Sequence, residues 1–233
     1  PEEIFSEDGK NFFIKNKPSE KVTVGPSESM SKSKKNTIDP EKMIESYGAD
    51  AVRLFILSDS PPEKDIQWSE TGMTSAYKFI QKFWMMSQNI IEIIKSEPDQ
   101  STDNGIEIFT NQSIKKIDTA LEKFRYNVII AVFHDIFNYY NKVSEKKKNY
   151  KNLKEKFEKI LTVMSPVIPH LTNECLRSLT SENSVWPRIK KEFLETDEKE
   201  IVIQINGKKR GNITINKKSE ENEIVAKIKE LDI

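Results

Sequence analysis

The chain has 233 residues, and its 37 lysines and arginines balance its 37 aspartates and glutamates, so the formal net charge is zero. A globally basic nucleic-acid binder is therefore excluded, although local basic patches remain possible. Seven glycines are too few for an architecture built on Gly-rich loops, and the single cysteine, Cys175, excludes an intramolecular disulfide and a multi-cysteine zinc site.

Short elements are expected in the first 67 residues. They are strands at 12–14 and 21–24 and helices at 40–47 and 51–57. Asp39 and Pro40 are typical of an N-cap followed by the first helical residue, and Gly48 supplies the left-handed residue that ends a helix. Asp50 is expected to cap the second of these helices.

Apolar residues three and four positions apart predict helices through the middle of the chain. They are expected at 69–95, 111–124, 126–143, 151–164 and 170–179, with a linker at 96–110. Phe124 is counted on the apolar side of the second helix, and Pro166 and Pro169 interrupt the pattern before the last. The short connections favour an antiparallel helical bundle, so the expected fold class is mainly α.

After residue 187 the period changes from helical to alternating. Isoleucines at 201, 203 and 205 predict a strand, the Asn206-Gly207 pair predicts a two-residue hairpin turn, and residues 213–215 belong to the return strand. A short helix beginning near residue 219 would complete the start of a small α/β unit.

Residues 27–36 form a loop of small polar and basic residues ahead of the first expected helix. Lys32, Lys34 and Lys35 place ammonium groups beside hydroxyls and exposed amides, an arrangement that suits a polyphosphate. The alternative is a solvated surface loop in a lysine-rich chain.

A first basic stretch, residues 141–160, holds eight lysines against three glutamates. With Tyr139, Tyr140 and Tyr150 beside it, this stretch is a candidate for phosphate contact and for stacking on bases. A solvated helix face explains the same composition equally well.

A second basic stretch, residues 206–218, holds four lysines and Arg210 and no acid. A hairpin tip would place Lys208, Lys209 and Arg210 where a nucleic-acid backbone can approach them. This stretch is therefore the sharper candidate for RNA contact.

The two histidines and the cysteine are interpreted as structural. His134 is expected to be a partly buried core residue, Cys175 a small packing residue, and His170 a capping or packing residue at a helix start. No pair of carboxylates and no nucleophile with a neighbouring base is visible in the bundle.

An ordered series of motifs points to one family. Met30-Ser31-Lys32-Ser33 resembles the second class I aminoacyl-tRNA synthetase signature, usually read Lys-Met-Ser-Lys-Ser. The other matching segments are Lys34 to Asn36, Asp39-Pro40, Tyr47 to Asp50, Arg53 to Phe55, Ser60 to Pro62, Asp65, Trp68-Ser69, Phe124 to Asn127, Pro166 to Glu174 and Gln204 to Arg210. Over about residues 20–215 the chain thus resembles the bacterial-type leucyl-tRNA synthetase family.

The resemblance implies three segments. Residues 1–67 would be the end of a class I catalytic domain with its signature loop, residues 68–190 a helical anticodon-binding domain, and residues 191–233 the start of an α/β domain that contacts tRNA. A complete enzyme of this family activates leucine with ATP and transfers it to tRNA(Leu).

The same resemblance assigns roles to individual residues. Lys32 would be catalytic, and Met30, Ser31, Lys32 and Ser33 would bind ATP. Lys208, Lys209 and Arg210 would bind tRNA. No metal site made of protein ligands is expected, and Mg²⁺ would arrive with ATP, held mainly by phosphates and water.

Location and completeness follow from what the chain lacks. No apolar run approaches the roughly 18 residues that span a bilayer, and no signal peptide is visible, so a cytoplasmic protein without membrane contact is expected. The family's other ATP signature, His-x-Gly-His, is absent, and the chain does not begin with Met. We therefore expect a carboxy-terminal piece that is inactive alone and that meets leucine and ATP through an upstream domain.

Two departures keep alternatives open. Ser29 stands where the signature has its first lysine, and Cys175 stands where a second glutamate is expected. One alternative is a valyl- or isoleucyl-type synthetase, against which the Gln204–Arg210 segment counts. The other is a non-catalytic helical RNA-binding module with an inactive signature, which Ser29 favours.

Overall fold

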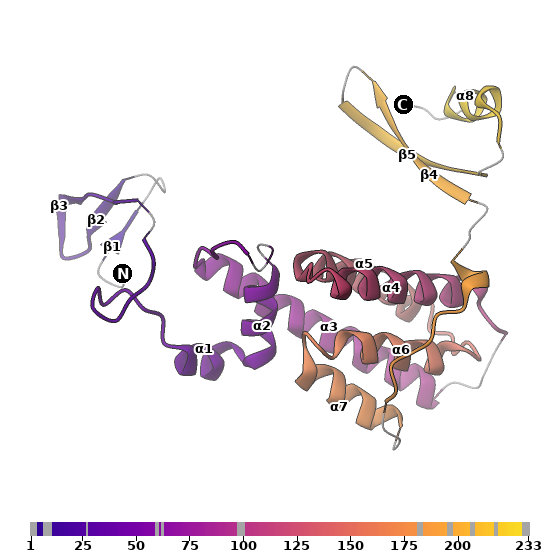
Figure 1. Ribbon diagram of the computed structural model, residues 1–233, viewed down its shortest axis with the longest axis horizontal. Coiled ribbons are helices and arrows are strands. Elements are labelled where there is room, and N and C mark those ends of the chain that lie inside the picture. The colour runs from indigo at the N-terminus through magenta and orange to yellow at the C-terminus, as the bar shows by residue number, and fades with distance from the viewer. Residues whose placement is uncertain are drawn as a thin grey trace. The chain divides into compact units, whose positions relative to one another are not determined.

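The computed structural model describes residues 4–6, 11–26, 28–58, 61, 63–96, 101–180, 184–194, 198–205, 208–216 and 219–229. For some of these it describes the backbone alone, namely residues 198–200, 204, 205, 208, 209, 214, 216, 226, 227 and 229. The chain divides into two compact units, Pro1–Met43 and Ile44–Ile233. Figure 1 shows their elements along the chain. The division into three domains after residues 67 and 190 stays a prediction.

The first unit holds a three-stranded antiparallel sheet in the order β1-β2-β3, made of Ile4–Phe5, Phe12–Ile14 and Lys17–Val22. The strand expected at 12–14 is confirmed. The next strand begins and ends earlier than the expected 21–24, because it pairs Ile14 with Lys17 and Phe12 with Val22 across a tight connection.

The first helix, α1 (Pro40–Tyr47), has the predicted limits. The Oδ1 atom of Asp39 accepts a hydrogen bond from the backbone N–H of Glu41 at 3.0 Å, which satisfies a donor of the first turn. Gly48 has a φ of +81°, and its N–H donates to the carbonyl of Ile44 at 2.8 Å. A left-handed glycine thus ends the helix, as the sequence predicts.

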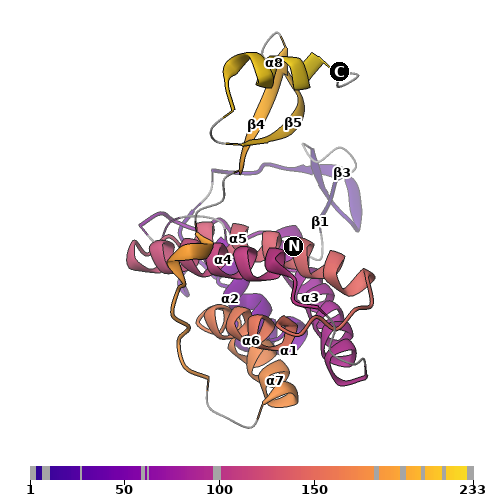
Figure 2. The ribbon, with the colours of Figure 1, turned by 90° about the vertical axis from the view of Figure 1, so that its right-hand side faces the viewer.

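Six helices of the second unit pack around one apolar core. They are α2 (Ala49–Ser58), α3 (Glu70–Ser96), α4 (Asn104–Glu122), α5 (Tyr126–Glu145), α6 (Leu153–Met164) and α7 (Pro169–Leu179). Figures 1 and 2 show α4 and α5 together on one side of the bundle and α7 on the opposite side. Phe83, Phe133 and Phe157 are wholly buried, and each burial of this kind contributes about 1.5–3 kcal/mol. The expected mainly α bundle is confirmed.

The start of α4 differs from the expectation. Residues 104–110 are helical rather than part of a linker, because the Oδ1 atom of Asp103 accepts hydrogen bonds from the N–H groups of Gly105 at 2.7 Å and Ile106 at 3.4 Å. Ile106 is then buried on the same helix face as Ile114 and Ile117. The stabilisation from this cap and from the burial of Ile106 exceeds the helix-destabilising effect of the glycine at position 105.

The end of α4 also differs. The helix ends at Glu122 rather than at residue 124, and Phe124 takes a left-handed conformation with a φ of +52°. The expectation that Phe124 lies on the apolar side of the helix is therefore wrong, since its side chain is 61% exposed.

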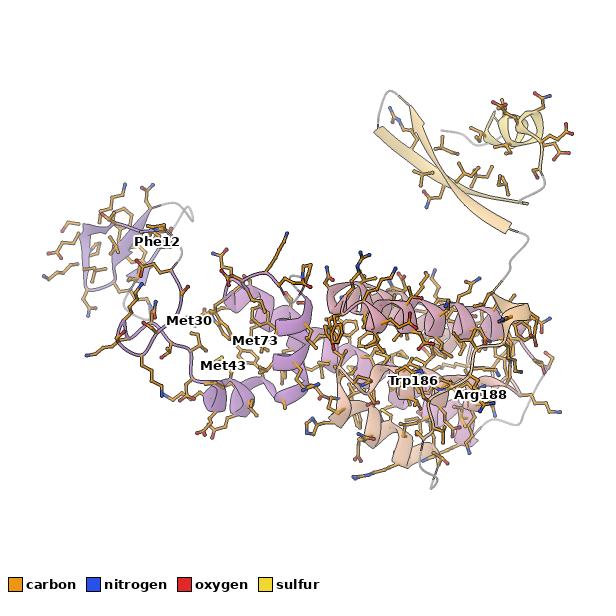
Figure 3. All side chains as sticks on the ribbon, in the orientation of Figure 1. Phe12, Met30, Met43, Met73, Trp186 and Arg188 are labelled. Carbon is orange, nitrogen blue, oxygen red and sulfur yellow. The ribbon has the colours of Figure 1, made fainter. Side chains whose placement is uncertain are left out.

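A strap, residues 184–194, follows the bundle and runs along α4. The indole N–H of Trp186, which Figure 3 labels, donates to Asp118 at 3.0 Å, and the backbone N–H of Lys190 donates to Asn111 at 2.8 Å. The strap ends in a short 3₁₀ turn, η1 (Lys191–Phe193), which packs against α4.

The last elements are an antiparallel hairpin, β4 (Glu198–Ile205) and β5 (Lys208–Asn216), and a helix, α8 (Glu221–Lys229). Pairing of Ile205 with Lys208 agrees with the predicted two-residue connection, although Asn206 and Gly207 themselves lie outside the described residues. The predicted strand, strand and helix order is confirmed.

Among the helices described, none combines the length and the apolar character that crossing a bilayer requires. Within the described ranges, three or more His, Cys, Asp or Glu side chains do not gather where they could hold a metal ion.

Candidate functional site

The signature loop is closed by one asparagine. The backbone N–H of Ser31 donates to the Oδ1 atom of Asn36 at 2.8 Å, and the Nδ2 atom of Asn36 donates to the carbonyl of Ser29 at 3.4 Å. Inside the loop, the hydroxyl of Ser31 lies 3.2 Å from that of Ser33 and accepts from the N–H of Lys34 at 3.3 Å. Polar contacts therefore shape the loop, and Met30 remains 46% exposed at its start.

The three lysines of this loop differ in their partners. Lys34 Nζ forms an ion pair with Glu28 at 2.7 Å. Lys32 and Lys35 are exposed and have no acidic partner in the part of the chain that the structure describes. The loop thus presents two unpaired ammonium groups, which is the electrostatic requirement for contact with a polyphosphate.

A carboxylate of α2 holds the start of α7. Asp50 is buried, and its two oxygens accept from the backbone N–H groups of His170 at 3.2 Å and Leu171 at 2.7 Å, while Nδ1 of His170 lies 2.9 Å from Oδ1. Asp50 lies within the first turn of α2 rather than before it, so the expected cap of α2 is instead the cap of α7. His170 is therefore a residue that Asp50 caps rather than a cap itself, and its side chain is 74% exposed.

Arg53 completes the same connection. Its Nε atom donates to the carbonyl of Val167 at 2.9 Å, and its Nη2 atom donates to the carbonyl of Pro166 at 2.7 Å. The structure therefore joins two motifs that lie more than 110 residues apart, and Asp50 and Arg53 together form a clamp on residues 166–171.

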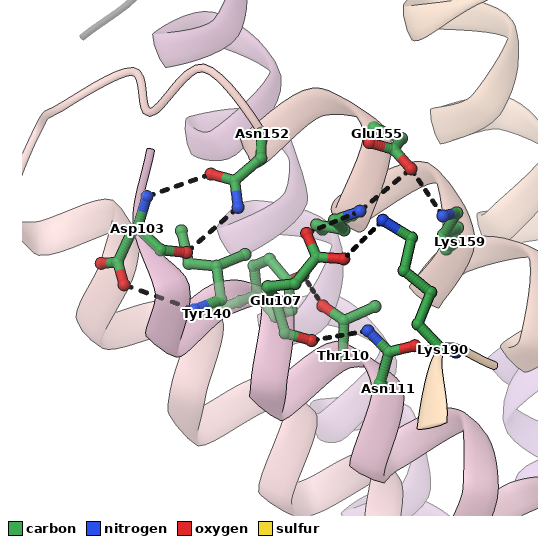
Figure 4. A network of polar contacts seen from close by, with 11 residues as sticks. Asp103, Glu107, Thr110, Asn111, Tyr140, Asn152, Glu155, Lys159 and Lys190 are labelled. Carbon is green, nitrogen blue, oxygen red and sulfur yellow. Dashed lines mark hydrogen bonds and ion pairs between the residues drawn. The ribbon is translucent and has the colours of Figure 1, made fainter. Parts of the chain in front are cut away.

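The first basic stretch is only partly a surface feature. Lys156 is 1% exposed and forms ion pairs with Glu107 at 2.7 Å and Glu155 at 2.9 Å. Lys190 from the strap reaches Glu107 at 3.3 Å, and Lys159 reaches Glu155 at 2.5 Å (Figure 4). These contacts make a charge network, buried at Lys156 and Glu107 and exposed at Glu155 and Lys190, that joins α4, α6 and the strap.

The network shifts the pKa of its members. Burial alone would raise the pKa of Glu107 and Glu155, but hydrogen bonds and charges from the lysines outweigh it, so both pKa values are lowered, that of Glu155 to about 2. Burial would likewise lower the pKa of Lys156, and its two glutamates raise it instead. All three groups are therefore charged at neutral pH.

Four exposed lysines of this stretch lie together in the turn after α5, where Lys146, Lys147, Lys148 and Lys151 all face solvent. Two of the three neighbouring tyrosines, Tyr139 and Tyr140, do not offer the expected stacking surface. Tyr140 is wholly buried, and the ring of Tyr139 already stacks on Phe109 with 3.9 Å between centroids.

The second basic stretch lies on β5. Its backbone is described at Lys208, Lys209 and Arg210, and Arg210 is exposed. The side chains of Lys208 and Lys209 lie outside the described residues. Their contact with RNA stays a prediction.

The remaining candidates of the sequence are structural. Cys175 is buried, and burial raises the pKa of its thiol to about 11, so the packing role is confirmed. His134 is exposed rather than partly buried, although its ring lies 4.4 Å from that of Phe79.

Two family models match parts of this chain. Residues 103–226 match the family model described as the anticodon-binding domain of tRNA ligase, and residues 22–69 match the model for class I tRNA synthetases (I, L, M and V).

Curated relatives include the leucine–tRNA ligases of Zymomonas mobilis, 36% identical over 219 residues, and Bartonella tribocorum, 33% identical over 242 residues. The alignments cover 92% and 98% of this chain but 25% and 27% of the relatives. The chain thus spans about a quarter of the length of the curated relatives that it matches.

A similar solved structure is the ternary complex of Agrobacterium radiobacter K84 agnB2 LeuRS, tRNA and LeuAMS. Its TM-score is 0.65 at 22% identity, and it covers 87% of this chain and 27% of that one. At 22% sequence identity, this structural similarity is evidence for the fold of the chain.

Proposed function

The chain belongs to the family of tRNA ligases that carry this anticodon-binding domain, and on that premise we propose that it takes part in the ATP-driven joining of leucine to tRNA(Leu). The observation that carries the proposal is its likeness to leucine–tRNA ligases over nearly its whole length. The proposed setting is the cytoplasm.

In the first step, the carboxylate of leucine attacks the α-phosphorus of ATP, and pyrophosphate leaves. Met30, Ser31, Lys32 and Ser33 would close over the ATP, and the ammonium of Lys32 would stabilise the charge that develops on the phosphorus and the leaving group. The exposed, unpaired state of Lys32 supports this role. ATP brings Mg²⁺, whose ligands are mainly phosphate and water oxygens.

In the second step, the leucyl group passes to the terminal adenosine of the tRNA. The helical segment 68–190 and the hairpin that carries Lys208, Lys209 and Arg210 would hold the RNA, while residues 1–67 supply the signature loop. Exposed lysines at 146–148 and 151 would add phosphate contacts.

A chimera tests the proposal. When this chain replaces the matching quarter of the Zymomonas mobilis ligase, the hybrid should attach leucine, and not valine or isoleucine, to tRNA(Leu). The chain alone should bind tRNA(Leu) but form no leucyl-adenylate, because one loop positions too few contacts to both substrates. Leucine-dependent pyrophosphate exchange by the chain alone would contradict the prediction that it forms no leucyl-adenylate. Absence of tRNA binding at low salt would contradict the proposed RNA role.

A second candidate is a non-catalytic RNA-binding module. It is favoured by Ser29, which removes one cation from the signature, and by the ion pair that occupies Lys34. A chimera that binds tRNA(Leu) but activates leucine only after Ser29→Lys would support this candidate.

A further inference from the structure

The turn between α4 and α5 exposes an aromatic ring between two cations. Phe124 is 61% exposed, and its neighbours Lys123 and Arg125 are both exposed. Neither cation has an acidic partner among the residues that the structure describes. Aromatic rings flanked by lysine or arginine are the elements with which proteins hold unpaired nucleotides.

A hollow of about 570 Å³ lies beside this ring. Pro61 and Glu63 line it from the segment after α2, and Asn127 and Val128 line it from the first turn of α5 together with residues 123–125. The volume lies within the range of about 300–1,000 Å³ that is typical of small-ligand sites. Its walls combine an apolar face, one carboxylate and two cations, which matches a base with its phosphates better than an apolar peptide.

The backbone of the turn holds Phe124 in a conformation that glycine adopts more easily. Its φ is +52°, and its N–H donates to the carbonyl of Leu121 at 3.0 Å, while the N–H of Arg125 donates to Ala120 at 2.8 Å. Bulky residues rarely adopt a positive φ, and such strain is concentrated at functional positions. The ring meets Tyr126 in a T-shaped arrangement, with 6.3 Å between centroids, so at least one face of the Phe124 ring takes no part in this contact.

We propose that Lys123, Phe124 and Arg125 form a platform for one unstacked nucleotide of the bound tRNA. Its base stacks on the ring of Phe124, and the adjoining phosphates contact Lys123 and Arg125. This inference rests on the proposed tRNA binding and adds a site that is separate from the basic stretches of the sequence.

The variant Phe124→Gly distinguishes a loss of base stacking from a loss of folding stability. Glycine suits the left-handed backbone, so the variant should melt at or above the temperature of the unchanged chain. Its affinity for tRNA(Leu) should fall by about 5- to 150-fold, the range that corresponds to loss of one base–aromatic stack. The slope of log K against log[salt] should not change, because no phosphate contact is removed, and Phe124→Tyr should bind like the unchanged chain.

Replacing the two cations, in contrast, should change the salt dependence of tRNA binding. Lys123→Ala and Arg125→Ala should each reduce the magnitude of the salt slope by about one unit. Trp84→Ala, which removes an aromatic residue that is 37% exposed on α3, is the matched control and should leave affinity unchanged.

The outcomes distinguish the two proposals. If the chain binds tRNA(Leu) but Phe124→Gly binds equally well, the platform is wrong and the proposed function stands. If the unchanged chain binds no tRNA at low salt, the proposed RNA role fails and the platform with it. A tRNA with 2-aminopurine at single unpaired positions adds a direct readout, since its fluorescence should be quenched on binding by the unchanged chain and by Phe124→Tyr, but not by Phe124→Gly.

Discussion

Lys32, Lys34 and Lys35 lie within four positions, yet among the residues that the structure describes only Lys34 forms an ion pair, with Glu28 at 2.7 Å. This difference predicts unequal effects in the chimera with the Zymomonas mobilis ligase. Lys32→Ala should lower the rate of leucine activation by about 10²–10³, or about 2.7–4 kcal/mol, with little change in leucine binding, because its charge acts mainly in the transition state. Lys34→Ala is the matched control and should change the rate far less. Single-turnover activation that is unchanged in Lys32→Ala and in the Lys32/Lys35 double alanine variant would contradict the assignment.

Lys156 shows what one buried cation contributes. Lys156→Ala leaves Glu107 buried with only Lys190 as a partner, so the free energy of unfolding should fall by about 3–5 kcal/mol. The double variant Lys156→Met/Glu107→Leu removes both charges and should recover most of this loss. Lys159→Ala disrupts a partly exposed ion pair and should cost about 0–1 kcal/mol. Urea unfolding measures all three, and equal losses for Lys156→Ala and Lys159→Ala would show that burial of the network is unimportant.

The same network gives a pH dependence. Because the folded-state pKa of Glu155 is lowered from 4.5 to about 2, its stabilising contribution is complete above about pH 4.5 and is lost as the pH falls toward 2. Glu107, whose pKa is also lowered, acts in the same direction. Urea midpoints between pH 2 and 6 should therefore fall less steeply for Glu155→Gln than for the unchanged chain, and parallel curves would contradict this.

At the scale of elements, the clamp that Asp50 and Arg53 of α2 form on residues 166–171 holds the start of α7 against α2. Asp50→Ala removes a charged acceptor from two backbone N–H groups of α7 and should lower the free energy of unfolding by about 1.5–3 kcal/mol. Asp39→Ala, which uncaps the exposed start of α1, is a matched control with an expected loss of about 0.5–1 kcal/mol. Denaturation of each variant checks the difference, and a smaller loss for Asp50→Ala than for Asp39→Ala would contradict it.

The elements that the sequence predicts well are those whose signals are local. The apolar spacing in α3, α5 and α6 and the glycine after α1 lie within each element, so their limits agree with the structure to within about two residues. Local sequence does not reveal the role of Asp50, because the N–H groups from which it accepts belong to a helix 120 positions away. Composition places Lys156 in a basic surface stretch, because its partner Glu107 belongs to another helix.

The residues of the candidate sites also differ in whether the local sequence predicts them. The signature loop was recognisable from contiguous residues, and its lysines are exposed as a phosphate-binding loop requires. The platform at Phe124 was missed because a phenylalanine at helical spacing predicts a core position. Only the end of α4 at Glu122 and the left-handed turn reverse that prediction.

At the scale of the whole molecule, the proposed RNA binding by a chain of zero net charge would depend on local charge. The magnitude of the salt slope for tRNA(Leu) binding should be roughly 2–5, which corresponds to a handful of phosphate contacts. Replacing Lys208, Lys209 and Arg210 with alanine should reduce it by about 2–3. A salt titration of both proteins measures this. Replacing Lys115, Lys116 and Lys191 provides a control of equal charge, and equal slopes for the two triple variants would exclude a special role for the hairpin.

The clamp also has a consequence for synthesis. His170 lies 120 positions after Asp50, so the partner of Asp50 is translated only 120 residues later. At about 5–20 residues per second, this separation corresponds to a delay of roughly 6–24 s on the ribosome. During that interval α2 has neither the carbonyls that Arg53 binds nor the N–H groups that Asp50 binds. The nascent bundle is therefore closed late, by the arrival of α7.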